Sequence, residues 1–245
     1  GGVPVRKRIY NAFTQIGYQI LTPEEMPSAL YNAVNFNVPQ YRPRVIILGV
    51  RRDSNIDLND LYKSIEREQK LNKKLTVKDA IGHLPPLYPL EQQVKDGRYM
   101  RSHQLNSNLE ITQHEARNHG PRERGIFKEW VENNMNYISH QAMIDYYYEK
   151  TGHKTLYQKY KNLEWDRPSH TIVAHLSKDG YMFIHPDSEQ QRSITIREAA
   201  CLMTFPVDFQ FLGSTPYYFK MIGNAVPVKF ASAIAKGLYK ALDKK

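Results

Sequence analysis

Apolar positions repeat at helical spacing near the start of the chain and then give way to a short continuous apolar run. Residues 4–16 have the period of an amphipathic helix, and Pro4 suits its first turn. The apolar face of this predicted helix is Val5, Ile9, Ala12, Phe13 and Ile16. Residues 18–21 follow as a candidate strand, and residues 44–50 (RVIILGV) predict a strand buried on both faces of a parallel sheet. This order of elements favours α/β architecture.

Helical signals return later in the chain. Residues 53–75 are polar and predict a linker with a helix, and residues 76–81 open a further helix. Thr195 and Glu198 have the spacing of a capping box, so a helix is predicted to begin there. Pro227 suits the first position of a terminal helix. The apolar face of that helix is Val228, Ala231, Ile234, Leu238 and Leu242.

The middle of the chain, residues 90–165, has little regular period but many basic and aromatic side chains. Two clusters stand out, at residues 117–124 and residues 146–165. Long side chains of these types can contact phosphates and stack beside bases. Alternatively, the tyrosines fill the small core of a loop-rich domain, and the pattern alone does not choose between these interpretations.

Composition narrows the class of protein. A length of 245 residues allows one large domain or two small ones. A hydrophobic content of 41% excludes a disordered chain, a collagen and a coiled coil. No apolar run approaches the roughly 18 residues that cross a membrane. The lone Cys201 excludes an intrachain disulfide and a cysteine-based metal cluster. We therefore expect a soluble, cytoplasmic protein, whose net charge of +9 suits either nucleic acid or simply solvent.

Three motifs occur in order from residue 38 onward. The first is residues 38–49 (VPQYRPRVIILG), a Gln-x-Arg-x-Arg sequence followed by the apolar run. The second consists of four strings, at residues 167–172 (RPSHTI), 185–186 (HP), 192–200 (RSITIREAA) and 204–206 (TFP). The third is residues 222–227 (IGNAVP). Each string is weak by itself, but together and in this order they resemble the C-terminal part of the DNA (cytosine-5) methyltransferases.

That resemblance implies a fold and a division into domains. The expected fold class is α/β, with the C-terminal part of a Rossmann-like methyltransferase domain and a smaller, mixed, loop-rich target recognition domain. Residues 1–57 are expected to end the catalytic domain, and residues 58–213 to form the target recognition domain. Residues 214–245 are expected to return to the catalytic domain. DNA sequence reading is expected within residues 58–165.

Three blocks of the family do not occur in the sequence: the Pro-Cys-Gln loop of the catalytic cysteine, the glycine-rich loop for S-adenosylmethionine and the Glu-Asn-Val block. Cys201 sits on an apolar helix face and is expected to be a small buried hydrophobe rather than the nucleophile. The resemblance therefore implies a C-terminal portion that is inactive alone and needs a partner, the N-terminal half with the catalytic cysteine.

Several origins of such a chain stay open: a subunit of a split enzyme, a fragment, or a degenerate remnant that only binds specific DNA. A weaker alternative is a structural partner that completes the sheet of another protein.

The activity that the resemblance implies is methylation of cytosine at C5 in double-stranded DNA, within a restriction–modification system. In this family the cytosine is extruded, a cysteine thiolate adds to C6, and C5 attacks the methyl group of S-adenosylmethionine. A guanidinium can stabilise the charge that develops on the base. By the family pattern Arg44 is the first catalytic candidate, with Arg42 beside it as a catalytic or a structural residue. Gln40 completes the set, mainly as an ordering residue, and alternation in an extended segment points all three to one side.

The terminal motif is expected to contact the cofactor. Asn224 and Ala225 precede a helix, whose first backbone amides attract anions such as the methionine carboxylate of S-adenosylmethionine. Without the family resemblance these residues indicate only a turn. Scaffold roles are expected for six further residues: Arg167, Thr171, Arg192, Thr195, Arg197 and Glu198. Of these, Arg197 and Glu198 are expected to form buried ion pairs. No metal is expected, because no histidine pair has ligand spacing beside acidic residues.

Overall fold

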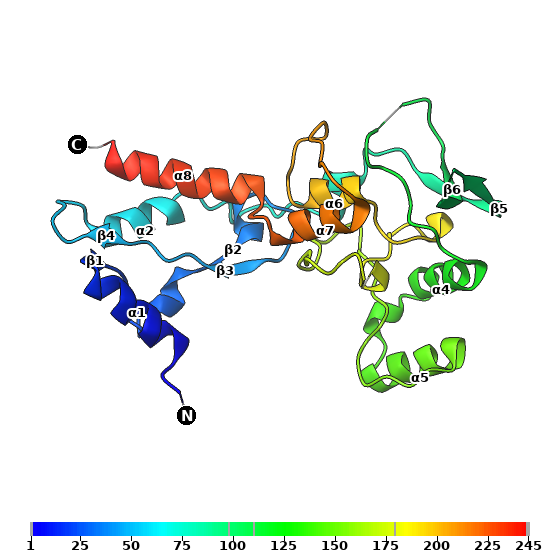
Figure 1. The fold of residues 1–245 in the computed structure, drawn as a ribbon, viewed down its shortest axis with the longest axis horizontal. Coiled ribbons are helices and arrows are strands. Elements are labelled where there is room, and N and C mark those ends of the chain that lie inside the picture. The colour runs from blue at the N-terminus through cyan, green and yellow to red at the C-terminus, as the bar shows by residue number, and fades with distance from the viewer. Residues whose placement is uncertain (1, 98, 110, 179, 244–245) are drawn as a thin grey trace.

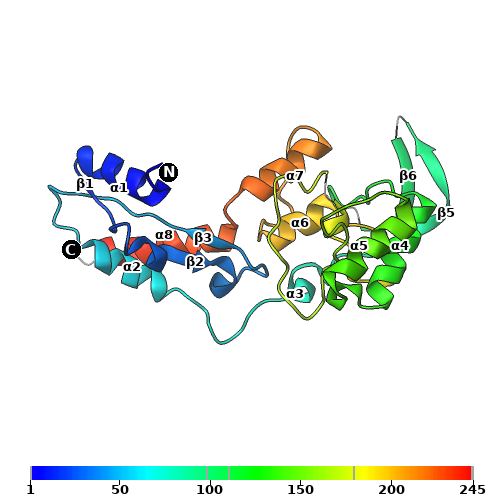
Figure 2. The ribbon, with the colours of Figure 1, turned by 90° about the horizontal axis from the view of Figure 1, so that it is seen from below.

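The computed structural model describes residues 2–243 apart from residues 98, 110 and 179, and the chain forms two lobes side by side (Figure 1). The first lobe contains residues 5–68 and the terminal helix α8 (Val228–Leu242), so the first and the last helix of the chain both lie in it (Figure 2). The second lobe contains residues 76–225. Residues 1, 98, 110, 179 and 244–245, which the predicted domains include, lie outside the described residues.

The first lobe combines helices with two small sheets. Its elements are α1 (Val5–Gln15), β1 (Tyr18–Gln19), η1 (Met26–Ala29), β2 (Leu30–Asn32), η2 (Ala33–Phe36), β3 (Pro43–Val45), β4 (Val50–Arg51), α2 (Leu58–Glu66) and α8. Strand β1 pairs with β4, and β2 pairs with β3. Both pairs are antiparallel, so the predicted buried parallel strand over residues 44–50 is wrong. The apolar run is divided between β3 and β4, and Val45 is 52% exposed.

Helices α2 and α8 hold the first lobe together by a close crossing. A Cβ atom on Gly237 would lie only 2.8 Å from Cα of Ile65, so the two backbones approach too closely for a larger residue. The buried ring of Phe230 packs 4.9 Å from that of Phe36. The face of α8 on this core is Phe230, Ala233, Ile234, Gly237, Leu238 and Ala241. Only Ile234 and Leu238 of this packed face also belong to the predicted face. The prediction followed large apolar residues, whereas small residues form the close crossing of the two helices.

The second lobe has two cores and an outer hairpin. Helices α3 (Val77–Ile81), α6 (Ile196–Leu202) and α7 (Thr215–Asn224) pack around one core. Helices α4 (Pro121–Glu132) and α5 (His140–Thr151) enclose the other, where the Trp130 ring lies 5.6 Å from Tyr146 and 5.5 Å from Tyr160. Strands β5 (Leu87–Asp96) and β6 (Tyr99–Leu105) form the antiparallel hairpin at the far end (Figure 1). Single 3₁₀ turns are η3 (Met135–Tyr137), η4 (Gly180–Met182) and η5 (Ser188–Gln190).

The helices whose start signals and apolar faces can be recognised within a short stretch of sequence are confirmed. Helices α1, α3, α6 and α8 lie where the pattern predicted them, and α6 begins with the capping box of Thr195 and Glu198. The stretch 90–165, in contrast, contains a hairpin and two helices that its pattern did not predict. Tyr146 and Tyr160 fill a core, as one alternative held, whereas Tyr148 and Tyr157 are 51% and 73% exposed.

Core packing divides the chain differently from the predicted domains. Helix α2 begins at residue 58, the predicted start of the target recognition domain, but it packs against α8 in the first lobe. Helix α7 was predicted to return to the catalytic domain, but Phe219 and Ile222 of this helix lie in the core of the second lobe. The division by function stays a prediction.

A buried ion pair lies at the centre of the second lobe. The guanidinium of Arg192 donates to both carboxylate oxygens of Glu198 at 2.7 Å, and Thr195 N donates to the same carboxylate at 2.7 Å. Burial raises the pKa of Glu198, but the charge and hydrogen bonds of Arg192 outweigh it, so the pKa lies below the ordinary range. The predicted buried pair of Glu198 is confirmed with Arg192 as its partner, whereas Arg197 donates to the carbonyl of Thr112.

Buried histidines near this pair are neutral. His185 lies 3.4 Å from Glu198, but burial lowers the pKa of His185 to about 3, so this contact does not join opposite charges. Burial also lowers the pKa of His103 to about 4, and it lowers the pKa of His119. A proton added to these imidazoles would have to be buried with its charge, which opposes folding in acid.

We expect the second lobe to lose stability as the pH falls from about 6.5 to about 4. Unfolded histidines bind protons in this range and the folded ones do not, so each removes up to about 1.4 kcal/mol of unfolding free energy per pH unit. Urea unfolding at stepped pH, followed by tryptophan fluorescence, measures this, because Trp130 and Trp165 both lie in the second lobe. His153→Gln, at an exposed position, is the control and should leave the profile unchanged. An unfolding free energy that is constant from pH 7 to pH 4.5 would contradict the expectation.

Candidate active site

The Gln-x-Arg-x-Arg segment and the turn between α7 and α8 meet at one place between the lobes. Arg42 Nη2 donates to the carbonyls of Gly223 at 2.8 Å and Ala225 at 3.0 Å. Arg42 Nη1 donates to the carbonyl of Ile172 at 2.6 Å. Two motifs that are separated by about 180 residues of sequence therefore border the same site, with Arg42 between them.

The surroundings of Arg42 are those of a structural arginine. Its side chain is 2% exposed, and burial together with the nearby charge of Arg44 lowers the pKa of Arg42 to about 10. The guanidinium is thus still charged at neutral pH. Three of its acceptors are backbone carbonyls of the second lobe, which favours the structural alternative for this residue.

Gln40 orders the same junction. Its Oε1 accepts from Ile172 N at 3.1 Å and from Arg42 Nη1 at 3.3 Å, and its Nε2 donates to the carbonyl of Leu202 at 3.4 Å. The side chain is fully buried. These contacts agree with the expectation that Gln40 orders the loop.

Arg44 is the member of the segment that faces solvent. It lies on β3 opposite Tyr31, and its Nη1 donates to the carbonyl of Pro43 at 2.7 Å. Its side chain is exposed, whereas Gln40 and Arg42 are buried, so the three side chains do not share one environment as the alternation predicted. Arg44 is the guanidinium in this segment that is free to meet a ligand.

Gly223 allows the turn to approach the second lobe. A Cβ atom at this position would lie 2.3 Å from Ala174 N and 2.3 Å from the carbonyl carbon of Val173. Both are backbone atoms and cannot rotate away. The glycine of the terminal motif is therefore required by a backbone contact rather than by its conformation.

The turn between α7 and α8 presents the exposed side chain of Asn224 to a ligand. At the start of α8, Val228 N donates to the carbonyl of Met203 at 3.2 Å, and Lys229 N donates to Thr204 Oγ1 at 3.0 Å. These two amides are already used, so they are not free to bind the anion that was predicted at this helix terminus. The exposed amide of Asn224 makes no hydrogen bond to the described residues, and it can both donate and accept.

Cys201 is unsuited to nucleophilic attack. It lies on α6 and borders a cavity of about 330 Å³ that Pro39, Thr204 and Lys229 also line. Burial raises the pKa of Cys201 to about 11, so the thiol stays protonated at neutral pH. Since the thiolate is the reactive form, this cysteine is inert there, as expected from its sequence setting.

Other predicted scaffold residues support the junction or lie apart from it. Thr171 Oγ1 donates to the carbonyl of Tyr41 at 2.7 Å, next to Gln40 and Arg42. Arg167 is exposed and pairs with Glu164 at 3.3 Å. Sequence reasoning missed the carbonyls of residues 172, 223 and 225, because a backbone acceptor leaves no signal in the residue type.

Two absences hold within the part of the chain that is described. No group of histidine, cysteine, aspartate and glutamate residues there could hold a metal ion. No helix there combines the length and the apolar composition needed to cross a bilayer.

Comparison with known proteins gives a family match along almost the whole chain. The model of the family "C-5 cytosine-specific DNA methylase" matches residues 4–240. The chain is 32% identical to the type II methyltransferase M.Bpa9945I of Bacillus paralicheniformis, over 96% of this chain and 56% of that protein. It is 27% identical to a type II methyltransferase assigned to Oceanobacillus iheyensis, over 99% of this chain and 66% of that protein. The chain thus spans about half to two thirds of the length of these relatives.

A solved structure supports the fold. A DNA modification methyltransferase encoded within a prophage of E. coli superposes with a TM-score of 0.53 and 22% identity, over 97% of this chain and 64% of that chain. The fold is therefore that of the α/β methyltransferases.

These matches correct one prediction. The chain was interpreted as a C-terminal part in which the resemblance starts at residue 38, with the N-terminal half of the enzyme as a separate partner. The family match instead begins at residue 4 and takes in α1, β1 and β2 as well. M.Bpa9945I likewise aligns with 96% of the chain. Nothing in these comparisons supports an inactive C-terminal portion that needs a separate half.

Gly223→Ala should destabilise the protein by about 3 kcal/mol, because the added methyl group forces the turn away from residues 173 and 174. Gly125→Ala on α4 is the matched control, since a Cβ atom there meets nothing within 4 Å. The control should be neutral or slightly stabilising, as alanine is the better helix former. Urea unfolding of both variants measures the difference. Equal stability of the two variants would contradict the close contact.

Arg42→Met should also cost about 3 kcal/mol or more, because it leaves two buried carbonyls and one partly buried carbonyl without their charged donor. Arg44→Met, two residues further along the chain and on β3, should change the unfolding free energy by less than about 0.5 kcal/mol because its side chain is exposed. Chemical denaturation of the two variants tests this contrast. If Arg42→Met is as stable as Arg44→Met, Arg42 is not the structural link.

Proposed function

Because the chain belongs to the C-5 cytosine-specific DNA methylase family, we propose that it acts in methyl transfer from S-adenosylmethionine to C5 of a cytosine in DNA, in a type II restriction–modification system. Its DNA partner is double-stranded, and prokaryotic relatives favour the prokaryotic cytoplasm as its location. The chain supplies DNA recognition and part of the sites for the cytosine and the cofactor.

The observation that carries this proposal is the meeting of two family motifs at Arg42. Its hydrogen bonds to Gly223 and Ala225 hold the arginine segment against the terminal motif. As a result, exposed Arg44 and exposed Asn224 flank one buried junction. A base and a methyl donor must be neighbours for transfer, so residues that serve each of them are expected to be neighbours too.

In the proposed mechanism Arg44 donates hydrogen bonds to the extruded cytosine or to its adjacent phosphate. Negative charge grows on the pyrimidine ring when a nucleophile adds to C6, and a guanidinium that is already in place stabilises that charge without reorganisation. Arg42 and Gln40 act by position: they hold β3 so that Arg44 projects from a rigid base. The charge of Arg44 is available because no carboxylate within the described residues pairs with it.

Asn224 and Ala225 are proposed to hold S-adenosylmethionine, which supplies the methyl group when bound. The fit rests on the Asn224 amide, which is exposed and has donors and an acceptor to spare. Ala225 contributes by its backbone position, since Arg42 fixes its carbonyl. The proposed polar contact to the cofactor is therefore the Asn224 side chain, in place of the backbone amides at the start of α8.

DNA recognition is proposed for the second lobe, within the predicted residues 58–213. The net charge of +9 suits a polyanion, and the second lobe carries exposed basic and aromatic side chains on its outer helices and loops.

In an assay in which the unchanged protein methylates duplex DNA, Arg44→Ala should lower the rate by about a hundredfold or more, while stability and DNA binding stay close to those of the unchanged protein. Incorporation of tritium from labelled S-adenosylmethionine into duplex DNA measures the rate. Arg44→Lys should restore only part of it, because an ammonium lacks the planar fork of donors.

Arg52→Ala is the matched control, an exposed arginine in the turn after β4 whose loss should leave the rate unchanged. A rate within twofold of the unchanged protein for Arg44→Ala would remove Arg44 from the mechanism.

A further inference from the structure

The chain that leaves α5 forms a basic and apolar surface that the site described above does not use. Residues 152–161 (GHKTLYQKYK) contain three lysines and a histidine but no aspartate or glutamate. Leu156 and Tyr157 are 79% and 73% exposed, and Lys154 and Lys159 are exposed beside them. We call the side chains of Lys154, Leu156, Tyr157 and Lys159 the α5 exit surface.

The positive charge of this surface is not neutralised within the protein. Lys150, at the end of α5, pairs with Glu129 at 2.9 Å. Among the described residues, neither Lys154 nor Lys159 has such an ion pair. Two unpaired lysines on one short segment repel each other weakly, and a row of phosphates would relieve that repulsion.

The segment is held in shape without a partner. Gly152 ends α5 in the left-handed conformation, with φ of +73°. Thr155 Oγ1 accepts from Tyr157 N at 3.1 Å, which fixes a tight turn. At the far end Tyr160 is buried and stacks on Tyr181 with ring centroids 5.7 Å apart. A surface that is already ordered loses little conformational entropy when it binds.

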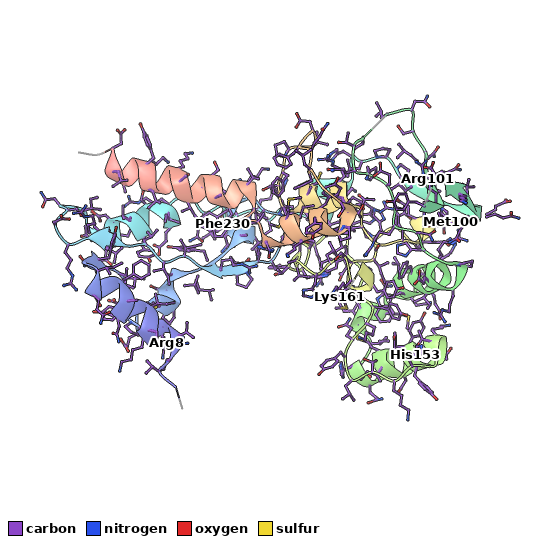
Figure 3. All side chains as sticks on the ribbon, in the orientation of Figure 1. Arg8, Met100, Arg101, His153, Lys161 and Phe230 are labelled. Carbon is purple, nitrogen blue, oxygen red and sulfur yellow. The ribbon has the colours of Figure 1, made fainter. Side chains whose placement is uncertain are left out.

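The segment runs from the outer end of α5 back toward the junction of the lobes. Figure 3 shows His153 beside α5 and Lys161 closer to the first lobe, which carries Arg44. A long ligand that reaches the junction can therefore extend along this segment. A duplex has that length, and a small molecule does not.

We propose that the α5 exit surface binds the sugar–phosphate backbone of double-stranded DNA. Lys154 and Lys159 each contact a phosphate, and the Tyr157 ring packs against the adjacent sugar. The apolar part, Leu156 and Tyr157, is small, which favours a phosphate backbone over a bilayer. This inference rests on the proposed function, since the DNA is the substrate duplex held away from the reacting cytosine.

The salt dependence of DNA binding tests the contact directly. The logarithm of the affinity falls with the logarithm of the salt concentration, with a slope of about −0.9 for each phosphate that the protein neutralises. Lys154→Gln and Lys159→Gln should each reduce the magnitude of this slope by about 0.9, and the double variant by about 1.8. The loss should be the same for duplexes of different sequence, because phosphates carry no base information.

Lys63→Gln on α2 is the control, an exposed lysine of the first lobe whose loss should leave the slope unchanged. Fluorescence anisotropy with a labelled duplex at stepped salt measures the unchanged protein and the four variants, and urea unfolding checks that each is folded. Equal slopes for the unchanged protein and the double variant overturn the inference and leave the proposed function standing. If the unchanged protein does not bind duplex DNA, both fail. If the double variant keeps its DNA slope but no longer binds phosphatidylserine vesicles, the surface binds membranes instead and the inference is overturned.

Discussion

The buried guanidinium of Arg42 is the interaction on which the rest of the structure depends. A charged group that is 2% exposed needs hydrogen-bond acceptors, and here three backbone carbonyls accept from its two Nη atoms. Those carbonyls belong to segments 130 and more residues further along the chain. The same hydrogen bonds that stabilise the charge therefore fix the first lobe against the second. Gln40 and Gly223 serve this contact, one by hydrogen bonds and the other by leaving room for it.

A rigid junction has a consequence for chemistry. Arg44 lies two residues beyond Arg42, and Asn224 lies between the two turn carbonyls that Arg42 binds, so neither can drift relative to the other. A guanidinium with four side-chain torsions is a poor catalytic group unless its backbone is fixed. The burial of Arg42 thus contributes to the precision of Arg44, although Arg42 itself faces no solvent. In the proposed function, Arg42 holds the segment in place and Arg44 contacts the ligand.

Sequence reasoning succeeded where the determinants are local. The capping boxes at Thr76 and Thr195 need only residues three positions away; the second was predicted, and a helix was predicted to begin at the first. It failed where the partner is distant: the run at residues 44–50 is as apolar as a buried strand, yet its pairing depends on β1 and β2. The motif gave the arginines but not their division of roles, because their burial is set by carbonyls from the other lobe. The exposed side of α8 was misjudged since alanine and glycine mark its packed face.

Access, rather than geometry, decides which polar clusters in this protein are chemical sites. Ser193 Oγ lies 3.0 Å from His119 Nε2, and His119 Nδ1 lies 3.5 Å from Glu123, an order of groups that resembles a hydrolytic triad. Ser193 is 1% exposed and His119 is 3% exposed, so no substrate carbonyl can reach them. This cluster belongs to the polar core of the second lobe. Arg44 and Asn224 have fewer contacts but open to solvent, and a ligand as large as DNA can meet only groups of that kind.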